Sequence, residues 1–293
     1  MKDTAFLAGY LRRIREFSPL VHNITNYVAM NLSANALLAI GASPLMSSEE
    51  KEMEEISAIS DALVINLGCI ESGQLRAARI AASEALCSGK PWVLDPVGAG
   101  LSLLRTSAAT QLAMEYGPSV IRGNASEIIA LANACAQAQC SPDMTAAHGV
   151  DSGVDSAMAI DSAKALALHS GAVVSVSGPV DYITDGKELV RVSNGHPIMP
   201  RVTAMGCTAS AVTAAFLAVT GRNGAEPGHD VRSGNGESDP RLEAAAAAML
   251  AMGIAGETAA KDCKGPGTFV PLFIDALANL PEHVSVAKYE KVQ

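Results

Sequence analysis

Residues 91–100 read PWVLDPVGAG, an apolar, β-rich run that ends at an aspartate and passes into a turn of proline and glycine. Strands that are apolar throughout are typical of a parallel sheet that is covered on both faces. Four further runs have the same character, and several of them also enter a turn with glycine or asparagine: ALVINLG (62–68), SVIRGN (119–124), AVVSVSG (172–178) and ELVRV (188–192).

Helical patterns separate these runs along the chain. We expect helices near residues 26–40, 49–60, 72–87, 103–115, 125–138, 156–169, 207–219, 240–261 and 269–279. Strands that alternate with helices predict an α/β fold with a mainly parallel central sheet and helices on both faces. Such sheets bind ligands beyond the carboxyl ends of their strands. The turns after Asn66, Asp95, Gly123 and Ser177 are therefore the predicted places for a site.

Composition excludes some classes of function. The formal net charge is −9 and no Lys/Arg cluster stands out, which argues against a nucleic-acid binder. Six cysteines without framework spacing indicate reduced, cytoplasmic thiols, and the scattered histidines lack zinc-site spacing. Apolar residues make up 49% and charged residues only 17%, so burial between subunits is one explanation of the composition.

Several local segments carry expectations of their own. The first 17 residues predict an amphipathic helix without a signal-peptide core. Residues 23–48 carry no charge, but asparagines, glycine and proline interrupt them, so they predict a turn and a buried helix rather than a membrane span. Ser47 to Glu50 form a capping-box pattern at the start of an acidic helix, with Met53 and Ile56 inward. We expect a hairpin at DYITDG and a flexible surface insertion at 221–241, within a single domain over residues 1–293.

Two strand ends suggest metal and phosphate chemistry. Asp95 in LDPVGAG can hold Mg²⁺ or cap the next helix, and the motif alone does not separate these two roles. In IRGNASEI, a guanidinium, an amide and a carboxylate (Arg122, Asn124 and Glu127) lie within six residues. They suit a metal–phosphate group, although Asn124 and Glu127 also resemble a capping box. Ser177 can bond a nucleotide phosphate or ribose, or can be an ordinary turn serine.

The stretch VTAMGCTASA (202–211) places Cys207 at a predicted helix start among small residues. Backbone N–H groups at such a helix start bind anions, and the helix dipole stabilises a thiolate, so this interpretation predicts a pKa of Cys207 below that of a free thiol. The alternative is a small buried cysteine beneath a crossing helix. No cysteine or histidine stands beside Cys207 to make a redox or nucleophilic pair.

Taken together, these motifs resemble one family. PLVHNITNYVAMNLSANALLAIGASPLMSS, LDPVGAG, IRGNASEI, VSGPVDYITDG, VTAMGCTASAV and GPGTFVPLFIDAL occur in the order and spacing of hydroxyethylthiazole kinase, a thiamine-salvage enzyme of the ribokinase-like superfamily. The resemblance runs from about residue 10 to 280 and breaks at 221–241. It implies a ribokinase-like fold without a separate lid, and ATP- and Mg²⁺-dependent phosphorylation of the primary hydroxyl of 4-methyl-5-(2-hydroxyethyl)thiazole.

The resemblance also implies a cytoplasmic homotrimer with sites between subunits. Carried over residue by residue, Asn26, Met46, Gly68 and Ala204 fall on the thiazole side. Arg122 and Ser177 fall at nucleotide-phosphate positions, with Ser177 in place of the usual threonine, and Asp95 and Glu127 fall at positions associated with magnesium and its water shell. Cys207 occupies the place of the superfamily's catalytic aspartate, where this family commonly has cysteine. The site residues that the resemblance implies are therefore Asn26, Met46, Gly68, Asp95, Arg122, Glu127, Ser177, Ala204 and Cys207.

One position departs from the family pattern, because Ala204 stands where a glycine is usual. An added methyl group is tolerated there if φ is negative. Two alternatives to the thiazole kinase remain. One is a kinase of the same fold for another small heterocyclic alcohol, such as a hydroxymethylpyrimidine. The other is a non-kinase, either an ATP-dependent dehydratase of damaged nicotinamide nucleotides or a catalytically silent ligand-binding member of the fold.

Overall fold

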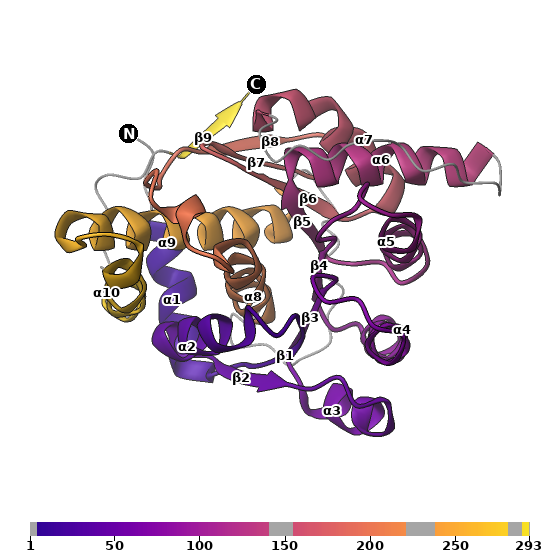
Figure 1. Cartoon of the computed structure of the whole chain (residues 1–293), viewed down its shortest axis with the longest axis horizontal. Coiled ribbons are helices and arrows are strands. Elements are labelled where there is room, and N and C mark those ends of the chain that lie inside the picture. The colour runs from indigo at the N-terminus through magenta and orange to yellow at the C-terminus, as the bar shows by residue number, and fades with distance from the viewer. Residues whose placement is uncertain (1–4, 141–154, 221–237, 281–288, 293) are drawn as a thin grey trace.

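The computed structural model describes residues 5–140, 155–220, 238–280 and 289–292. Its centre is one nine-stranded sheet in the order β2-β1-β3-β4-β5-β6-β7-β8-β9 (Figure 1). Neighbouring strands from β2 to β6 run parallel, and β7, β8 and β9 are antiparallel to their neighbours. The strands are β1 (Leu20–Ile24), β2 (Ser43–Met46), β3 (Ala62–Asn66), β4 (Trp92–Asp95), β5 (Val120–Asn124), β6 (Val173–Ser177), β7 (Asp181–Thr184), β8 (Leu189–Val192) and β9 (Tyr289–Val292).

Helices cover both faces of the sheet, as the sequence predicts (Figure 1). One face carries α1 (Ala5–Phe17), α2 (Met30–Ile40), α8 (Met205–Ala218), α9 (Pro240–Asp262) and α10 (Pro266–Ala278). The other carries α3 (Met53–Ile59), α4 (Ser72–Ser88), α5 (Leu103–Glu115), α6 (Ala125–Cys140) and α7 (Ile160–Ser170). Three short 3-10 helices complete the described elements: η1 (Glu50–Glu52), η2 (Ser156–Ala159) and η3 (Met199–Arg201). The prediction of a mainly parallel α/β fold is therefore confirmed.

Consecutive side chains of the central strands point alternately into the two hydrophobic cores, one on each face of the sheet. On β3, Leu63 and Ile65 belong to the core beneath α3–α7, whereas Ala62 and Val64 belong to the core beneath α8 and α9. This two-residue alternation is the geometry of a pleated strand, and both faces here are apolar because both are covered. The small side chains of α8 and α9 are almost all buried, which allows both helices to pack closely on the sheet.

Helix α9 is the one described helix that is long and apolar enough to cross a membrane by composition. In the fold, 83% of its apolar window is buried. Its apolar character is therefore that of a core helix. Five cysteines are free thiols in this structure: Cys69, Cys87, Cys135, Cys207 and Cys263.

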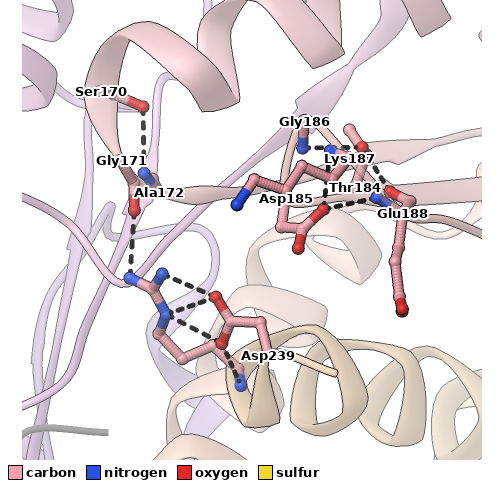
Figure 2. Close-up of polar contacts among 10 residues, drawn as sticks. Ser170, Gly171, Ala172, Thr184, Asp185, Gly186, Lys187, Glu188 and Asp239 are labelled. Carbon is pink, nitrogen blue, oxygen red and sulfur yellow. Dashed lines mark hydrogen bonds and ion pairs between the residues drawn. The ribbon is translucent and has the colours of Figure 1, made fainter. Parts of the chain in front are cut away.

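The hairpin expected at DYITDG is present as β7, a tight turn and β8. Asp185 closes the turn, because its Oδ1 accepts hydrogen bonds from the backbone N–H groups of Lys187 at 2.8 Å and Glu188 at 2.7 Å (Figure 2). Asp239 lies nearby at the N-cap of α9, where its Oδ1 accepts from the backbone N–H of Arg241 (Figure 2). The predicted insertion 221–241 falls on residues 221–237, which lie outside the described residues, and on the start of α9.

Two sequence expectations near the amino terminus need correction, and a third is confirmed. The uncharged segment 23–48 holds α2 but also two strands, since β1 ends inside it and β2 lies near its end. The predicted capping box at Ser47 does not form, because Glu49 is the N-cap residue of η1 and accepts from the N–H of Lys51. The expected burial of Met53 and Ile56 in the following helix is confirmed.

Candidate active site

Four polar side chains replace the valines of the α8-facing core at the carboxyl ends of adjacent strands. The residue two positions earlier on each strand is a buried valine beneath α8 (64, 93, 120 and 173). Asn66 pairs with Asp95, and Arg122 pairs with Ser175; the β4–β5 register, continued by one residue, sets Asp95 beside Arg122. We call these four residues the polar row: Asn66, Asp95, Arg122 and Ser175. All four are buried.

A hydrogen-bonded chain of side chains connects the polar row to Cys207. Asn26 Nδ2 donates to Asn66 Oδ1 at 2.9 Å and to Cys207 Sγ at 3.3 Å. Asn66 Nδ2 donates to Asp95 Oδ2 at 2.6 Å, and the Ser210 hydroxyl donates to the same oxygen at 2.8 Å. The structure thus brings together Asn26, Asp95 and Cys207, which are far apart in the sequence.

The carboxyl group of Asp95 is buried away from water and lies close to other charged side chains. Burial first, and then the negative charge of Glu127, raise the pKa of Asp95 to about 6. The charge of Arg122 and the hydrogen bonds from Ser210 and Asn66 act in the opposite direction. A cation close to Asp95 and Glu127 would relieve this repulsion.

Arg122 presents a buried cation to the start of α8. Its Nη1 donates to the carbonyl oxygen of Gly206 at 2.9 Å, while its Nε is buried without a hydrogen-bond partner. The side chain is only 6% exposed. Ala204 is the N-cap residue of α8, and its side chain does not bond the free backbone N–H groups of the first turn. Those N–H groups and the guanidinium of Arg122 are therefore both available as hydrogen-bond donors to an anion.

Glu127 forms the capping arrangement that its motif predicts and also reaches the neighbouring loop. Asn124 Oδ1 accepts from the backbone N–H of Glu127, and Glu127 Oε2 accepts from that of Asn124, both at 2.9 Å. Glu127 Oε1 accepts from the N–H of Gly98, also at 2.9 Å. The carboxylate therefore ties the turn after β4 to the start of α6, and its negative charge is felt at Asp95.

Ser177 and Met46 occupy the ends of two strands at some distance from the chain of hydrogen bonds. The Ser177 hydroxyl donates to the carbonyl oxygen of Gly123 at 3.2 Å and stands in register with Asn124. Met46 ends the edge strand β2 in register with Asn23, with β1 between it and β3. Both lie at the carboxyl edge of the parallel strands, although no described hydrogen bond joins them to Cys207.

Gly68 follows β3 and lies directly against Asn26. A β-carbon added at Gly68 would stand 2.6 Å from Asn26 Nδ2, closer than a real β-carbon comes to another atom. The backbone N–H of Gly68 also donates to Asn66 Oδ1 at 2.9 Å. Glycine is therefore required at this position if Asn26 is to keep its place.

The predicted lowering of the Cys207 pKa is wrong. Burial, followed by the negative charge of Asp95, raises the pKa of the Cys207 thiol to about 11, and the hydrogen bond from Asn26 and the charge of Arg122 offset only part of this rise. The helix begins at Met205, so Cys207 does lie in its first turn, as expected. Burial is the largest cause, and with a pKa of about 11 Cys207 is a neutral thiol at neutral pH.

Ala204 does not meet the condition under which its methyl group is tolerated. Its φ is 68° and its ψ 0°, in the left-handed region, where a side chain is strained. The carbonyl oxygen of Ala204 nevertheless starts α8 by accepting from the N–H of Thr208 at 2.8 Å. The chain therefore holds an alanine in a backbone conformation that favours glycine.

Replacing Ala204 with glycine is expected to stabilise the protein by about 1 kcal/mol, because glycine adopts a positive φ without strain. Chemical denaturation of the two proteins measures this difference. The matched control is Ala136→Gly on the exposed side of α6, where glycine should cost about 1 kcal/mol as in any helix interior. Equal losses in both variants would show that Ala204 is not strained.

The donor set fits a magnesium ion that takes most of its ligands from elsewhere. Among the described residues, no three His, Cys, Asp or Glu side chains gather closely enough to hold a metal ion. Two carboxylates are nevertheless on hand at this end of the sheet, since the negative charge of Glu127 is, after burial, the second cause that raises the pKa of Asp95. Carboxylate oxygens together with waters and phosphate oxygens are the usual ligands of Mg²⁺.

Sequence reasoning assigned no role to three residues that the structure places at the site. Asn66 and Ser210 hold Asp95, and Arg105 binds the backbone carbonyls of Leu67 and of Val97, the latter at 3.0 Å. Asn66 carried a signal, since it ends a predicted strand as Asp95 does. Ser210 and Arg105 lie within ordinary helical sequence, where nothing distinguishes them.

Comparisons with known proteins show which family the chain belongs to. The model of the Hydroxyethylthiazole kinase family matches residues 11–283. A protein of Nitratidesulfovibrio vulgaris named hydroxyethylthiazole kinase is 46% identical over 282 residues, which cover 96% of each chain. One of the same name from Cereibacter sphaeroides is 44% identical over 268 residues, which cover 92% of this chain and 91% of the relative.

Solved structures give the same result for the fold. The structure of hydroxyethylthiazole kinase protein from Pyrococcus horikoshii OT3 is similar with a TM-score of 0.81 at 36% identity, over 98% of this chain and 99% of that one. The pyridoxal kinase of Staphylococcus aureus in complex with pyridoxal shares the fold at a TM-score of 0.60 and 18% identity, over 94% and 98% of the two chains. A ribokinase-like superfamily protein of Enterococcus faecalis, over 92% of this chain and 88% of its own, shares it at a TM-score of 0.59. The chain therefore has a ribokinase-like fold, and it belongs to the hydroxyethylthiazole kinase family.

Proposed function

We propose that this protein transfers the γ-phosphoryl group of ATP to the primary hydroxyl of 4-methyl-5-(2-hydroxyethyl)thiazole, the reaction that the names of its relatives describe. The observation that carries the proposal is the position of Arg122. Its buried, unpartnered Nε and the first turn of α8 lie beside Asp95 and Cys207, so that anion-binding donors adjoin a carboxylate and a thiol.

The acceptor alcohol belongs on the side of Asn26 and Cys207. Asn26, Gly68 and Cys207 lie together, and we assign to them the hydroxyl-bearing end of the thiazole, with Met46 and Ala204 bordering it. As a neutral thiol, Cys207 can orient the hydroxyl through a hydrogen bond but cannot take up its proton. We assign that proton, which leaves the alcohol only late in the transfer, to an oxygen of the transferred phosphoryl group. A loose transition state leaves the alcohol oxygen largely protonated until the phosphoryl group arrives, which makes little demand on a base.

The nucleotide belongs on the side of Arg122 and Ser177. Arg122 and the N–H groups at the start of α8 would neutralise charge on the transferred phosphoryl group, since preformed donors in a dry site stabilise developing charge well. We assign the Ser177 hydroxyl, at the end of the next strand, to a phosphate, to which it would donate in place of the Gly123 carbonyl oxygen. Asp95 and Glu127 would hold Mg²⁺ between them and the phosphates, partly through water. When bound, the ion neutralises phosphate charge.

A homotrimer with sites at its interfaces is part of the proposal. Tyr27 and Val28, next to Asn26 in sequence, are 64% and 61% exposed, and exposed apolar groups beside a site favour a protein partner. A neighbouring subunit that covers them would complete the thiazole pocket. We also assign the chain to a single kinase domain in the cytoplasm, since the described strands form one sheet and the described cysteines are free thiols.

Replacing Cys207 with alanine is expected to lower kcat by roughly 10- to 100-fold and not to abolish it, because the transition state asks little of a base. Cys207→Asp should be as fast as the wild type or faster, since a carboxylate accepts a proton more readily than a neutral thiol. Steady-state ADP release with saturating Mg·ATP and thiazole measures both variants. Complete loss in the alanine variant together with no recovery in the aspartate variant would contradict this role.

A panel of acceptors tests the proposed function against its alternatives. The wild type receives Mg·ATP with hydroxyethylthiazole, a hydroxymethylpyrimidine, pyridoxal or a hydrated nicotinamide nucleotide, and product is followed by mass spectrometry. We expect the highest kcat/KM with the thiazole. A higher value with another alcohol would make the protein a kinase of the same fold for that substrate, and dehydration of the nicotinamide nucleotide would make it a repair enzyme.

A further inference from the structure

Asn66 stands at the centre of the hydrogen-bonded chain that joins Cys207 to Asp95. Its Oδ1 accepts from Asn26 Nδ2 and from the backbone N–H of Gly68, each at 2.9 Å. Its Nδ2 donates to Asp95 Oδ2 at 2.6 Å. The side chain is 1% exposed and is therefore held by protein groups alone. One carboxamide thus contacts the thiazole side of the proposed site and its carboxylate side.

The direction of every hydrogen bond in this chain is fixed. Asn26 Oδ1 accepts from the backbone N–H of Ala29 at 3.0 Å, so its nitrogen must face the other way. Both N–H bonds of that nitrogen are then used, one toward Asn66 Oδ1 and one toward Cys207 Sγ. Asn66 cannot be flipped either, because its oxygen receives two donors and its nitrogen meets a carboxylate oxygen.

The surroundings of Asn66 are built around these contacts. Leu63 and Ile65 on the same strand enter the opposite core, and Val64 shows what the fold places on this face when it needs only an apolar filler. Burying a carboxamide costs free energy unless its N–H and C=O groups are hydrogen-bonded. The asparagine at this position is therefore explained by the hydrogen bonds that it makes and not by the space that it fills. Gly68 leaves room for the Asn26 side chain that Asn66 binds.

We propose that Asn66 is a positioning residue of the phosphoryl transfer. It fixes the orientation of Asn26, and through Asn26 that of the Cys207 sulfur, relative to the carboxylate of Asp95. It acts through these neighbours and not on the reacting atoms. The inference rests on the proposed function and deepens it, because it names the residue that aligns the acceptor end of the site with the phosphate end.

A double-mutant cycle tests the proposal. ADP release is measured for the wild type, Asn26→Ala, Asn66→Ala and the double variant, with kcat and both KM values. Asn66→Ala should lower kcat on the order of 10²-fold, because misplacement of a reacting group by about 1 Å has an effect of that size. Its KM values should change by less than about threefold, since lost alignment removes transition-state interactions rather than ground-state binding.

The losses in kcat should not multiply. If Asn66 acts through Asn26, the double variant will be no slower than the slower single variant, whereas independent residues give the product of the two losses. The control cycle pairs Asn26→Ala with Asn194→Ala, a buried asparagine that bonds Glu257 at 3.2 Å beyond β8, and there the effects should multiply. Thermal unfolding of each variant verifies that it is folded. Asn66→Ser replaces the alanine variant if that variant fails to fold.

The failure of the inference and the failure of the proposed function look different. An active wild type with multiplicative losses at Asn26 and Asn66, or a rise in KM that accounts for the whole loss, would overturn the positioning role and leave the function standing. A wild type that releases no thiazole-dependent ADP would overturn both.

Discussion

Replacing Arg122 with alanine is expected to lower kcat about 10³-fold, the largest loss for any single side chain of the site. The physical reason is the state of its guanidinium, which is buried with Nε unpartnered and Nη1 fixed by the carbonyl oxygen of Gly206. A cation that is already dehydrated and held in place stabilises phosphoryl charge without reorganisation. Pre-steady-state and steady-state ADP release together measure the loss in the chemical step.

Lysine at the same position is the control. Arg122→Lys keeps the charge but lacks the planar fork that binds the Gly206 carbonyl and an anion together, so we expect it to recover only part of the lost rate. Full recovery would show that charge alone matters there. A loss of less than tenfold in the alanine variant, with its fold intact by thermal unfolding, would contradict the assignment of Arg122 to the phosphoryl group.

Replacing Asp95 with asparagine is expected to lower kcat by about 10² to 10³-fold and at the same time to stabilise the free protein. The catalytic loss follows from the loss of a carboxylate that we assign to Mg²⁺. The gain in stability follows from the pKa of Asp95, which burial and the charge of Glu127 raise to about 6 from 3.8 in the unfolded chain. Ionised Asp95 therefore lowers the free energy of unfolding.

The pH dependence of this gain has a definite sign. Below about pH 3 the carboxyl group is protonated in both states and contributes no difference. As pH rises to about 6, the unfolded chain releases the proton first, so the wild type loses stability relative to Asp95→Asn. Above pH 7 the difference is constant, on the order of 3 kcal/mol.

Chemical denaturation from pH 4 to 8, without magnesium or nucleotide, measures the difference between the two proteins. Asp262→Asn on the exposed end of α9 is the control and should show no such change with pH. A difference between wild type and Asp95→Asn that is flat from pH 4 to 8 would contradict the raised pKa.

Much of the fold follows from patterns that single segments carry. The five predicted strands correspond to β3, β4, β5, β6 and β8, because each is a compact apolar run bounded by turn residues. Three strands were missed, β1, β2 and β9, and the first two for physical reasons that their sequences show. β1 contains buried His22 and Asn23, which interrupt an apolar pattern, and β2 is a four-residue edge strand with a proline, which only an edge tolerates.

The site residues were predictable only where a polar residue stands at or just after the end of an apolar strand in the sequence. Asp95 is the last residue of β4, Arg122 lies near the end of β5, and Glu127 lies in the first turn of α6 just after β5. The structure gathers them, because the carboxyl ends of parallel strands meet at one edge of the sheet. The ionisation of Cys207 was not predictable, because burial and the neighbouring Asp95 are products of the tertiary fold. The backbone strain at Ala204 likewise depends on the angle at which α8 starts.

The most direct test of the whole account is the formation of the phosphorylated thiazole itself. Wild-type protein is mixed with ATP and hydroxyethylthiazole, with and without Mg²⁺, and the product is identified by mass spectrometry and phosphorus NMR. The account predicts a monophosphate ester on the hydroxyethyl oxygen, in an amount equal to the ADP released and only when Mg²⁺ is present. ADP release that does not depend on the thiazole, or no phosphate ester on the thiazole, would contradict it.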